Sequence, residues 1–291
     1  MPGVSVLTPS YRYVRFIEDA IESVVRQDRL AVEHVVQDGM SDDGTLDILK
    51  RYGDRIVWTS EPDQGQSDAL NRALAKATGT WIAWLNADEF YLPGALATLV
   101  RQAERAGADV VYGDCVFVDA GGRIERLLPQ HRFSAKILRE YGCYIPSNAV
   151  LIRRSALGDA PWDPTVKRIM DWDLYLKLLR GGARFSHVTY PAAAFRSHDE
   201  RVTSKPPPDF EEENEVTSRY GLPRDVWDRW RASRVGRWLH PVYKAVDGAY
   251  TRQLRARSLR GRDLRWFDDP RGLETFEELL RRAYPFQSRR R

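Results

Sequence analysis

Short apolar runs alternate with longer stretches of helical periodicity through the first 115 residues of the chain. Runs bounded by Pro, Gly or Asp predict strands, and apolar positions three and four apart predict helices. The expected strands are 4–8, 33–39, 56–58, 81–85 and 110–114, and the expected helices are 14–26, 45–52, 67–77 and 93–105. Alternating strands and helices with short connections are typical of a parallel, doubly wound α/β sheet with helices on both faces.

Polar clusters follow the first four expected strands. They are Thr-Pro-Ser at 8–10, Asp-Gly at 38–39, Glu-Pro-Asp at 61–63 and Asn-Ala-Asp at 86–88. The carboxyl ends of parallel strands meet at one edge of a sheet, and ligands bind at that edge. The sequence therefore predicts a ligand site where the four clusters converge.

The pattern changes after residue 115. Residues 116–123 are expected to be a strand that enters a Gly-Gly turn, 149–152 another strand, and 171–179 a helix. Three consecutive prolines at 206–208 indicate a boundary, since they suit neither a helix nor a sheet interior. We expect one domain over 1–205, divided into halves at 115/116, and a helical extension over 206–291.

The charge is uneven along the chain. Residues 229–291 carry seventeen Lys or Arg against seven Asp or Glu, a net charge of +10, so the overall +4 leaves −6 for the preceding residues. This basic segment also contains Trp and Tyr. Four interpretations stay open: docking on anionic lipid, a dimerisation or lid element, a nucleic-acid patch, and a solvated basic face. The doubly wound first half argues against nucleic acid.

The apolar runs, the first residues and the cysteines indicate where in the cell the protein is expected. No run of eighteen apolar residues occurs, so no membrane-spanning helix is expected. The first ten residues lack the basic start and long apolar stretch of a secretory signal. Cys115 and Cys143 lack metal-type spacing, which favours two reduced thiols in a cytoplasmic protein.

Several acids and amides near the expected strand ends are candidates for ligand binding. Asp38 closes a strand, and its carboxylate could accept an N–H from a uracil-like base. Asp68 and Asn71 lie three apart, on one face of a helix. Asn86 and Asp88 would point the same way if the chain is extended there. The alternatives are helix caps at Ser41, Asp42 or Ser67 and a solvated loop at 86–89.

Two further segments carry candidate chemistry. Asp171 and Asp173 open the helix expected over 171–179, where capping and the helix dipole would explain acids without any catalysis. His198 is a candidate metal ligand only if the fold brings it to Asp88. The region 126–147 carries no motif, and His131, Arg132, Tyr144 and Asn148 are candidates to line an acceptor pocket.

Together, in order, these segments resemble the family 2 inverting glycosyltransferases of the GT-A fold. The resemblance covers roughly residues 3–204. It rests on Thr8-Pro9-Ser10-Tyr11, Asp38-Gly39-x-Ser41-x-Asp43-Gly44-Thr45, Glu61-Pro62-Asp63-x-Gly65-Gln66-x-Asp68-Ala69-x-Asn71, Asn86-Ala87-Asp88, Asp171-Trp172-Asp173-Leu174 and Arg196-x-His198. It implies an α/β fold of GT-A type: a doubly wound, mixed and mostly parallel sheet with helices on both faces, followed here by a helical, basic C-terminal extension.

The resemblance also implies site residues. The nucleotide would be held by Thr8, Pro9, Ser10, Tyr11, Asp38, Gln66, Asp68, Asn71, Asn86 and Ala87. Asp88 and His198 would bind Mn²⁺ or Mg²⁺, with Asn86 in place of the first Asp of the Asp-x-Asp motif. Asp171 would be the catalytic base, although Met170 stands where the family often has Glu. Asp171 and Asp173 lie about 200° apart on a helix, so they cannot both face the acceptor.

The implied reaction is an inverting transfer of a sugar from a nucleotide-diphosphate sugar, with UDP favoured, to an acceptor hydroxyl. The acceptor would be a glycan or a lipid-linked molecule in polysaccharide or glycoconjugate biosynthesis. Residues 1–115 would form the nucleotide-binding half and 116–205 the acceptor half. A homodimer and peripheral contact of 229–291 with the inner face of the membrane are further expectations, and no nucleic-acid partner is expected.

Two rival functions remain at this point. The first is a nucleotide-sugar-binding protein with degraded catalysis, which Asn86 and Met170 would permit. The second is a nucleotidyltransferase that makes the sugar donor. The latter would need a Gly-rich, basic phosphate loop after the first strand, and residues 8–13 contain no glycine.

Overall fold

The computed structural model describes residues 3–28, 30–199, 211–222 and 239–285. The strands in these ranges are β1 (Val4–Ser10), β2 (Val32–Asp38), β3 (Val57–Ser60), β4 (Trp81–Trp84), β5 (Phe90–Tyr91), β6 (Val110–Val118), β7 (Ile124–Leu128), β8 (Val150–Arg153) and β9 (Phe185–Arg196). The helices are α1 (Ile17–Val25), α2 (Thr45–Tyr52), α3 (Gln66–Lys76), α4 (Ala95–Ala106), α5 (Ala135–Glu140), α6 (Met170–Arg180), α7 (Glu211–Arg219), α9 (Ala249–Ala256) and α10 (Pro270–Ala283). Residues 239–246 are also helical.

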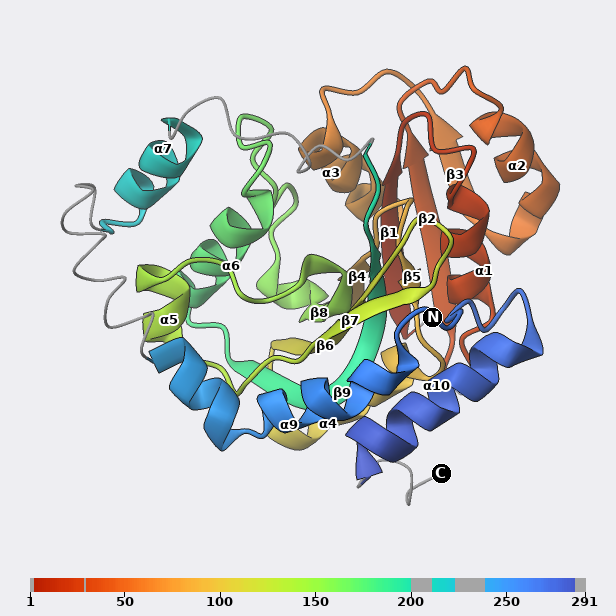
Figure 1. The fold of residues 1–291 in the computed structure, drawn as a ribbon. Coiled ribbons are helices and arrows are strands. Elements are labelled where there is room, and N and C mark those ends of the chain that lie inside the picture. The colour runs from red at the N-terminus through yellow and green to blue at the C-terminus, as the bar shows by residue number, and fades with distance from the viewer. Residues whose placement is uncertain (1–2, 29, 200–210, 223–238, 286–291) are drawn as a thin grey trace.

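All of these strands belong to one mixed sheet, as expected (Figure 1). Their order is β3-β2-β1-β4-β8-β6-β9-β5, and β7 pairs with β6. The strands β1 to β4 run parallel to one another. The strand β8 runs antiparallel to both β4 and β6, which makes the sheet mixed. The strands β1 to β4, from residues 4–84, therefore form a continuous parallel block.

Helices cover both faces of the sheet, and alternate residues of β1 contact opposite faces. Val4 and Val6 belong to a buried cluster with α1, α4 and α10. Leu7 belongs to a second cluster with α3, α5 and α6. Residues of a strand point alternately to its two faces. A strand that is buried on both faces, such as β1, therefore needs apolar residues at odd and at even positions.

Two differences from the expected elements have clear causes. Residues 110–114 and the first part of 116–123 form one strand, β6, which ends at Val118; its first part pairs with β8 and its second with β7. The strand β9 carries no strand signal in the sequence because Pro191 lies within it. The register of β9 against β6 shifts at that position, and such an irregularity is where a strand accepts proline.

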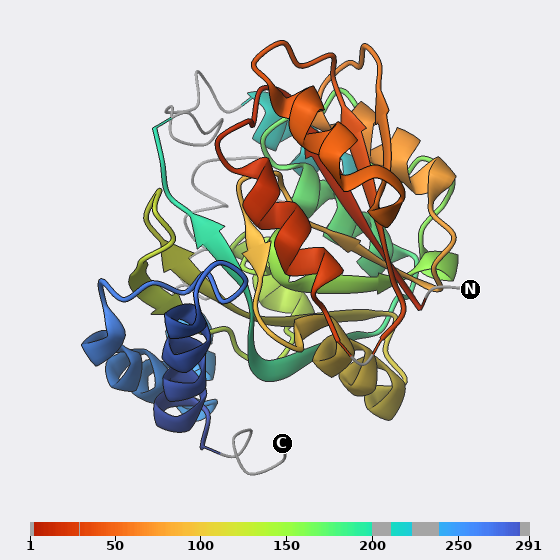
Figure 2. The same ribbon diagram turned by 90° about the vertical axis from the view of Figure 1, so that its right-hand side faces the viewer.

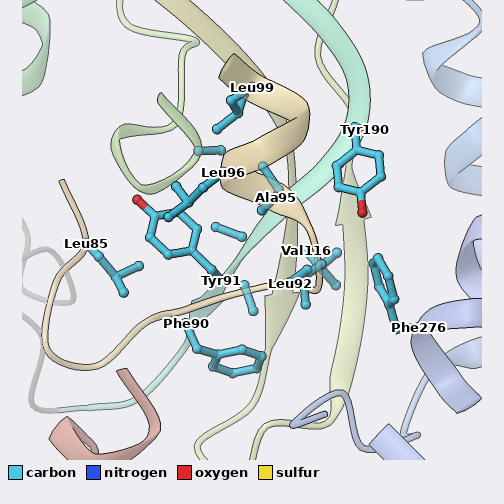
Figure 3. Close-up of a cluster of buried hydrophobic side chains, with 14 of the residues drawn as sticks. Leu85, Phe90, Tyr91, Leu92, Ala95, Leu96, Leu99, Val116, Tyr190 and Phe276 are labelled. Carbon is cyan, nitrogen blue, oxygen red and sulfur yellow. The ribbon is translucent and has the colours of Figure 1, made fainter. Parts of the chain in front are cut away.

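The C-terminal helices pack on the sheet. In Figure 3 the ring of Phe276, from α10, lies beside the cluster that β5, α4 and β9 supply. The Phe276 and Tyr190 ring centroids are 6.3 Å apart, and those of Phe267 and Phe90 are 5.6 Å apart. The blue helices gather at the end of the molecule opposite α2 and α3 (Figures 1 and 2). The described part of the extension thus shares the core of the preceding residues.

Two further expectations from the sequence concern the domain boundary and a membrane-spanning helix. The proline boundary at 206–208 lies outside the described residues, so the partition into 1–205 and 206–291 remains a proposal. Within the described parts of the chain, no helix has both the length and the apolar character that a membrane span requires.

Candidate active site

The polar strand ends of the parallel block meet at one edge, as predicted. Ser10 lies opposite Asp38 in the sheet register, and Asp38 lies opposite Ser60. Backbone hydrogen bonds continue past the strands, from Gly39 N to Ser10 O at 2.8 Å and from Glu61 N to Asp38 O at 3.0 Å. We call this edge the donor edge. It brings residues from three strands side by side.

Asp38 is fully buried at this edge, and its carboxylate organises the following loop. It accepts the backbone N–H of Ser41 at 2.9 Å, the Ser41 hydroxyl at 2.6 Å and the Ser60 hydroxyl at 2.8 Å. Ser41 therefore does not cap α2. Asp42 pairs instead with Arg12, and Asp43 accepts the backbone N–H of Thr45. The cap expected at Ser41 or Asp42 was placed one or two residues too early.

Backbone strain is concentrated at the same edge. Among the described residues other than glycine, only Arg12 and Met40 have positive φ, at 59° and 66°. Each lies two residues beyond the end of a strand, Arg12 after β1 and Met40 after β2. A Cβ at Gly39 would lie 2.8 Å from Asp63 Oδ2, so a larger residue there would have to displace the Asp63 side chain. Strained, tightly packed backbone of this kind clusters at functional sites.

The Asn86–Asp88 segment is a turn rather than an extended chain. The backbone N–H of Glu89 bonds to the carbonyl of Asn86 at 3.1 Å. The prediction that Asn86 and Asp88 point the same way therefore rests on a wrong local geometry. The Asn86 side-chain oxygen accepts Trp84 Nε1 at 2.8 Å and Gln66 Nε2 at 2.6 Å. Asn86 thus links β4 to the start of α3.

Asp88 and His198 lie together, although 110 residues separate them in the sequence. His198 Nε2 is 2.9 Å from Asp88 Oδ2, and both side chains are almost fully buried. A carboxylate suits Mn²⁺ or Mg²⁺ when diphosphate oxygens and water complete the shell, and an imidazole is a ligand of divalent transition metals. No group of three or more His, Cys, Asp or Glu side chains suited to a metal occurs within the described residues.

Arg196 holds this pair in place from inside the protein. Its guanidinium donates to the backbone carbonyls of Asp88 at 2.9 Å and Ala120 at 2.6 Å, and to the Asp19 carboxylate at 2.5 Å. The side chain is 2% exposed. A buried arginine that ties α1, the Asp88 turn and β9 together fixes where His198 emerges.

Other predicted nucleotide contacts have different surroundings. Thr8 is buried and its hydroxyl lies 2.8 Å from His34 Nε2, while Ala87 belongs to the core under α1 and α2. Asn71 bonds through both ends of its amide to the backbone of Trp162. Asp68 pairs with Arg72. Nucleotide contact by these side chains stays a prediction.

Three predicted residues remain at the rim of the donor edge. Pro9 and Ser10 are buried at the end of β1, and Tyr11 beyond them is 54% exposed. Burial leaves the Ser10 hydroxyl without a hydrogen-bond partner among the described residues. Ser67 does not cap α3, since its hydroxyl donates to the carbonyl of Val166 at 3.2 Å.

The start of α6 contacts the start of α3. Ser67 Oγ also lies 3.7 Å from the sulfur of Met170, the first residue of α6. Asp171 follows directly, half-buried, and accepts its neighbour's N–H and the Cys143 thiol, with 3.6 Å between Sγ and Oδ2. Burial raises the pKa of Asp171. A carboxyl with a raised pKa is a stronger base, as proton abstraction requires.

Asp173 lies on a different face of α6 from Asp171 and contacts α7. Its carboxylate accepts Arg219 Nη1 at 3.1 Å and the Tyr220 hydroxyl at 3.0 Å. Arg219 also pairs with Asp163 at 2.8 Å. Asp173 is 3% exposed. The two acids thus separate as helical geometry predicts, and Asp173 has a structural partner.

The helix α7 supplies this partner; it was expected as part of the helical extension, but its contact with α6 was not. Glu212 on α7 accepts the backbone N–H groups of Arg168 and Ile169 at 2.7 and 2.9 Å. These N–H groups immediately precede α6, where unpaired donors and the helix dipole favour a carboxylate. We call these contacts of Glu212, Arg219 and Tyr220 the α7 clamp. The run of three acids at 211–213 was the available signal.

The four residues expected to line an acceptor pocket have different surroundings. His131 and Tyr144 are buried and stacked, with ring centroids 4.6 Å apart. Arg132 pairs with Asp247, and Asn148 donates to the carbonyl of Ala194. His131 also contacts His240, in helix 239–246, at 3.0 Å. His131 and Arg132 therefore contact the C-terminal helical region, whereas Asn148 contacts β9.

Comparison with known proteins agrees with this geometry. A family profile described as "Glycosyl transferase family 2" matches residues 5–158. A PGL/p-HBAD biosynthesis glycosyltransferase of Mycobacterium bovis is 30% identical over 205 residues, which cover 64% of this chain and 75% of the relative. The putative teichuronic acid biosynthesis glycosyltransferase TuaG of Bacillus subtilis is 30% identical over 212 residues, which cover 70% and 82%.

Solved structures support the fold. S. aureus TarS 1-349 in complex with UDP-GlcNAc aligns with a TM-score of 0.64 at 16% identity, over 96% of this chain and 81% of that chain. The mannosyltransferase PcManGT of Pyrobaculum calidifontis, in complex with GDP-Man and Mn²⁺, aligns with a TM-score of 0.53 at 19% identity, over 99% and 87%. The expected GT-A fold is confirmed. The chain belongs to glycosyl transferase family 2.

Proposed function

We propose that the protein transfers a sugar, with inversion, from a nucleoside-diphosphate sugar to an acceptor hydroxyl in glycan biosynthesis. The observation that carries this proposal is the meeting of Asp88 and His198 beside the donor edge. Two relatives are named for roles in the biosynthesis of PGL/p-HBAD and of teichuronic acid. UDP is favoured as the nucleotide, because TarS has been solved with UDP and with UDP-GlcNAc.

In the proposed arrangement the diphosphate lies against the donor edge. Asp88 and His198 would hold a divalent metal ion, which stabilises negative charge on the leaving diphosphate when it is bound. PcManGT has been solved with Mn²⁺. The buried Asp38 is suited to the base of the nucleotide, since a fixed carboxylate at a strand end accepts an N–H.

Asp171 is the proposed general base. It takes the proton of the acceptor hydroxyl as that oxygen forms a bond to the anomeric carbon. The bond from this carbon to the diphosphate oxygen breaks on the opposite face, and the nucleoside diphosphate leaves with the electron pair. Two observations support Asp171 over Asp173: the raised pKa of Asp171 and the commitment of Asp173 to Arg219.

The first experiment is a donor-hydrolysis and transfer assay with several nucleotide sugars, each with Mn²⁺, with Mg²⁺ and with a chelator. Turnover that depends on the metal would support the proposal and identify the nucleotide. Donor binding without any turnover, under every condition and acceptor tried, would instead favour a nucleotide-sugar-binding protein.

The metal site is tested by the variant Asp88→Ala. Loss of a ligand should weaken metal-dependent donor binding by about a hundredfold or more. Isothermal calorimetry with and without chelator measures this. Asp54→Ala is the matched control, because Asp54 is exposed on the loop after α2. If neither the chelator nor Asp88→Ala changes the donor affinity, the proposed metal role is refuted.

A further inference from the structure

Large apolar side chains are exposed along two consecutive helices near the C-terminus. Val242 and Val246, in helix 239–246, are 51% and 69% exposed, and Tyr250 and Leu254, in α9, are 47% and 61% exposed. Residues four apart share one face of a helix. Each helix therefore presents an apolar pair to solvent. We call these four residues the apolar stripe.

The opposite faces of both helices already hold them on the protein. On α9 the buried residues are Ala249, Arg252 and Ala256. Arg252 Nε lies 3.2 Å from the Asp114 carboxylate, inside the sheet. In helix 239–246, His240 stacks on the ring of Tyr141 and contacts His131. The stripe is thus not needed to attach the helices to the fold, and its exposure requires another explanation.

Only some of the arginines near the stripe form ion pairs with carboxylates. Arg262 and Arg282 pair with Glu278, while Arg265 and Arg271 pair with nearby aspartates. In contrast, the exposed arginines that follow the stripe have no carboxylate partner among the described residues. They are Arg255, Arg257 and Arg260. The free positive charge therefore lies at the end of α9, next to the stripe.

We propose that the apolar stripe and these three arginines dock the protein on an anionic lipid bilayer. Apolar side chains of such a helix enter the boundary between headgroups and acyl chains, and nearby arginines are attracted to anionic headgroups. A second copy of the chain is a poorer occupant. A two-fold contact through the stripe would add the uncompensated arginines of one copy to those of the other at a single interface, and like charges oppose association.

The stripe is tested by vesicle sedimentation with the full chain. The vesicles contain either phosphatidylcholine alone or equal parts of phosphatidylcholine and phosphatidylglycerol. Wild type should sediment with the anionic vesicles only. The double variant Val242→Asp, Val246→Asp should bind them about tenfold or more weakly. Val57→Asp is the matched control, because Val57 is 44% exposed on β3, at the other side of the sheet.

The charge is tested separately by the triple variant Arg255→Gln, Arg257→Gln, Arg260→Gln. Three charges near an anionic surface should change the affinity on the order of a hundredfold. Added salt should weaken the wild type and leave the triple variant nearly unchanged, because only the electrostatic part of binding is screened.

Several outcomes would overturn the proposal. They are equal sedimentation of wild type and stripe variant, no binding of wild type to anionic vesicles, or a dimer in light scattering that the stripe variant abolishes. Circular dichroism checks folding, and Val242→Ser with Val246→Ser replaces the aspartate variant if that one unfolds. Sedimentation needs no turnover, so a failure here is distinguishable from a failure of the proposed transferase activity.

Discussion

The two sides of the candidate site are built in different ways. The donor edge comes from residues 8–89, where adjacent parallel strands place their polar ends together through backbone hydrogen bonds. The side that carries Asp171 is assembled from distant segments, since Cys143, Asp171 and the α7 clamp come from separate parts of the chain.

The difference concerns how each side keeps its geometry. At the donor edge, sheet register fixes the positions, and the buried carboxylate of Asp38 holds the loop after β2. At the start of α6, side-chain hydrogen bonds and ion pairs from α7 take that role. Substitutions should therefore separate donor binding from transfer.

The largest effect is expected for Asp171→Asn compared with Asp173→Asn. Asp171→Asn should reduce transfer by about 10²–10⁴-fold, because the base is lost, and should leave donor affinity unchanged. Asp173→Asn should lower thermal stability through the Arg219 contact and keep turnover in the folded protein. Product assays, calorimetry and thermal melts measure the three quantities. The reverse pattern would make Asp173 the base.

A smaller effect should follow from breaking the α7 clamp with Arg219→Met. Asp173 would stay buried without its cation, at a cost of about 3 kcal/mol in the free energy of unfolding. Displacement of α6 should lower kcat by about tenfold or more without changing the KM for the donor. Denaturant unfolding and steady-state kinetics test both statements.

Arg72→Met provides the control for the clamp. The Arg72–Asp68 pair is partly exposed on α3 and should contribute less than about 1 kcal/mol. If Arg72→Met lowers stability as much as Arg219→Met, the distinction between a clamped and an unclamped side is wrong. A raised donor KM in Arg219→Met would also contradict it.

The smallest effect concerns the pH dependence of transfer. Asp171 must be ionised to accept a proton, and burial raises its pKa, so activity should fall with decreasing pH earlier than for an ordinary aspartate. The Cys143 thiol acts in the opposite direction, because its hydrogen bond stabilises the carboxylate and lowers this pKa. Cys143→Ala should therefore move the acidic limb of kcat/KM to higher pH.

Cys143→Ser is the matched variant for this measurement. Its hydroxyl can still donate to Asp171, so the acidic limb should stay near that of the wild type. An acidic limb that is unchanged in Cys143→Ala, or that moves to lower pH, would remove Cys143 from the surroundings of the base.

The sequence by itself predicted the parallel block and its donor edge. The period of apolar residues sets the strands and helices, and parallel connections then force the strand ends of 8–10, 38–39 and 61–63 to one edge. Residues 45–52 formed α2 as predicted. The rules involved act over few residues, so a single sequence carries them.

Only the tertiary structure decided the rest. It showed that 86–89 is a turn, that β9 continues through Pro191, and that Arg219 of α7 pairs with Asp173. It also separated paired from free arginines in the basic extension. The path of β9 and the pairing of Asp173 with Arg219 depend on partners far away in the chain, and long-range contacts leave no periodic signal in the sequence.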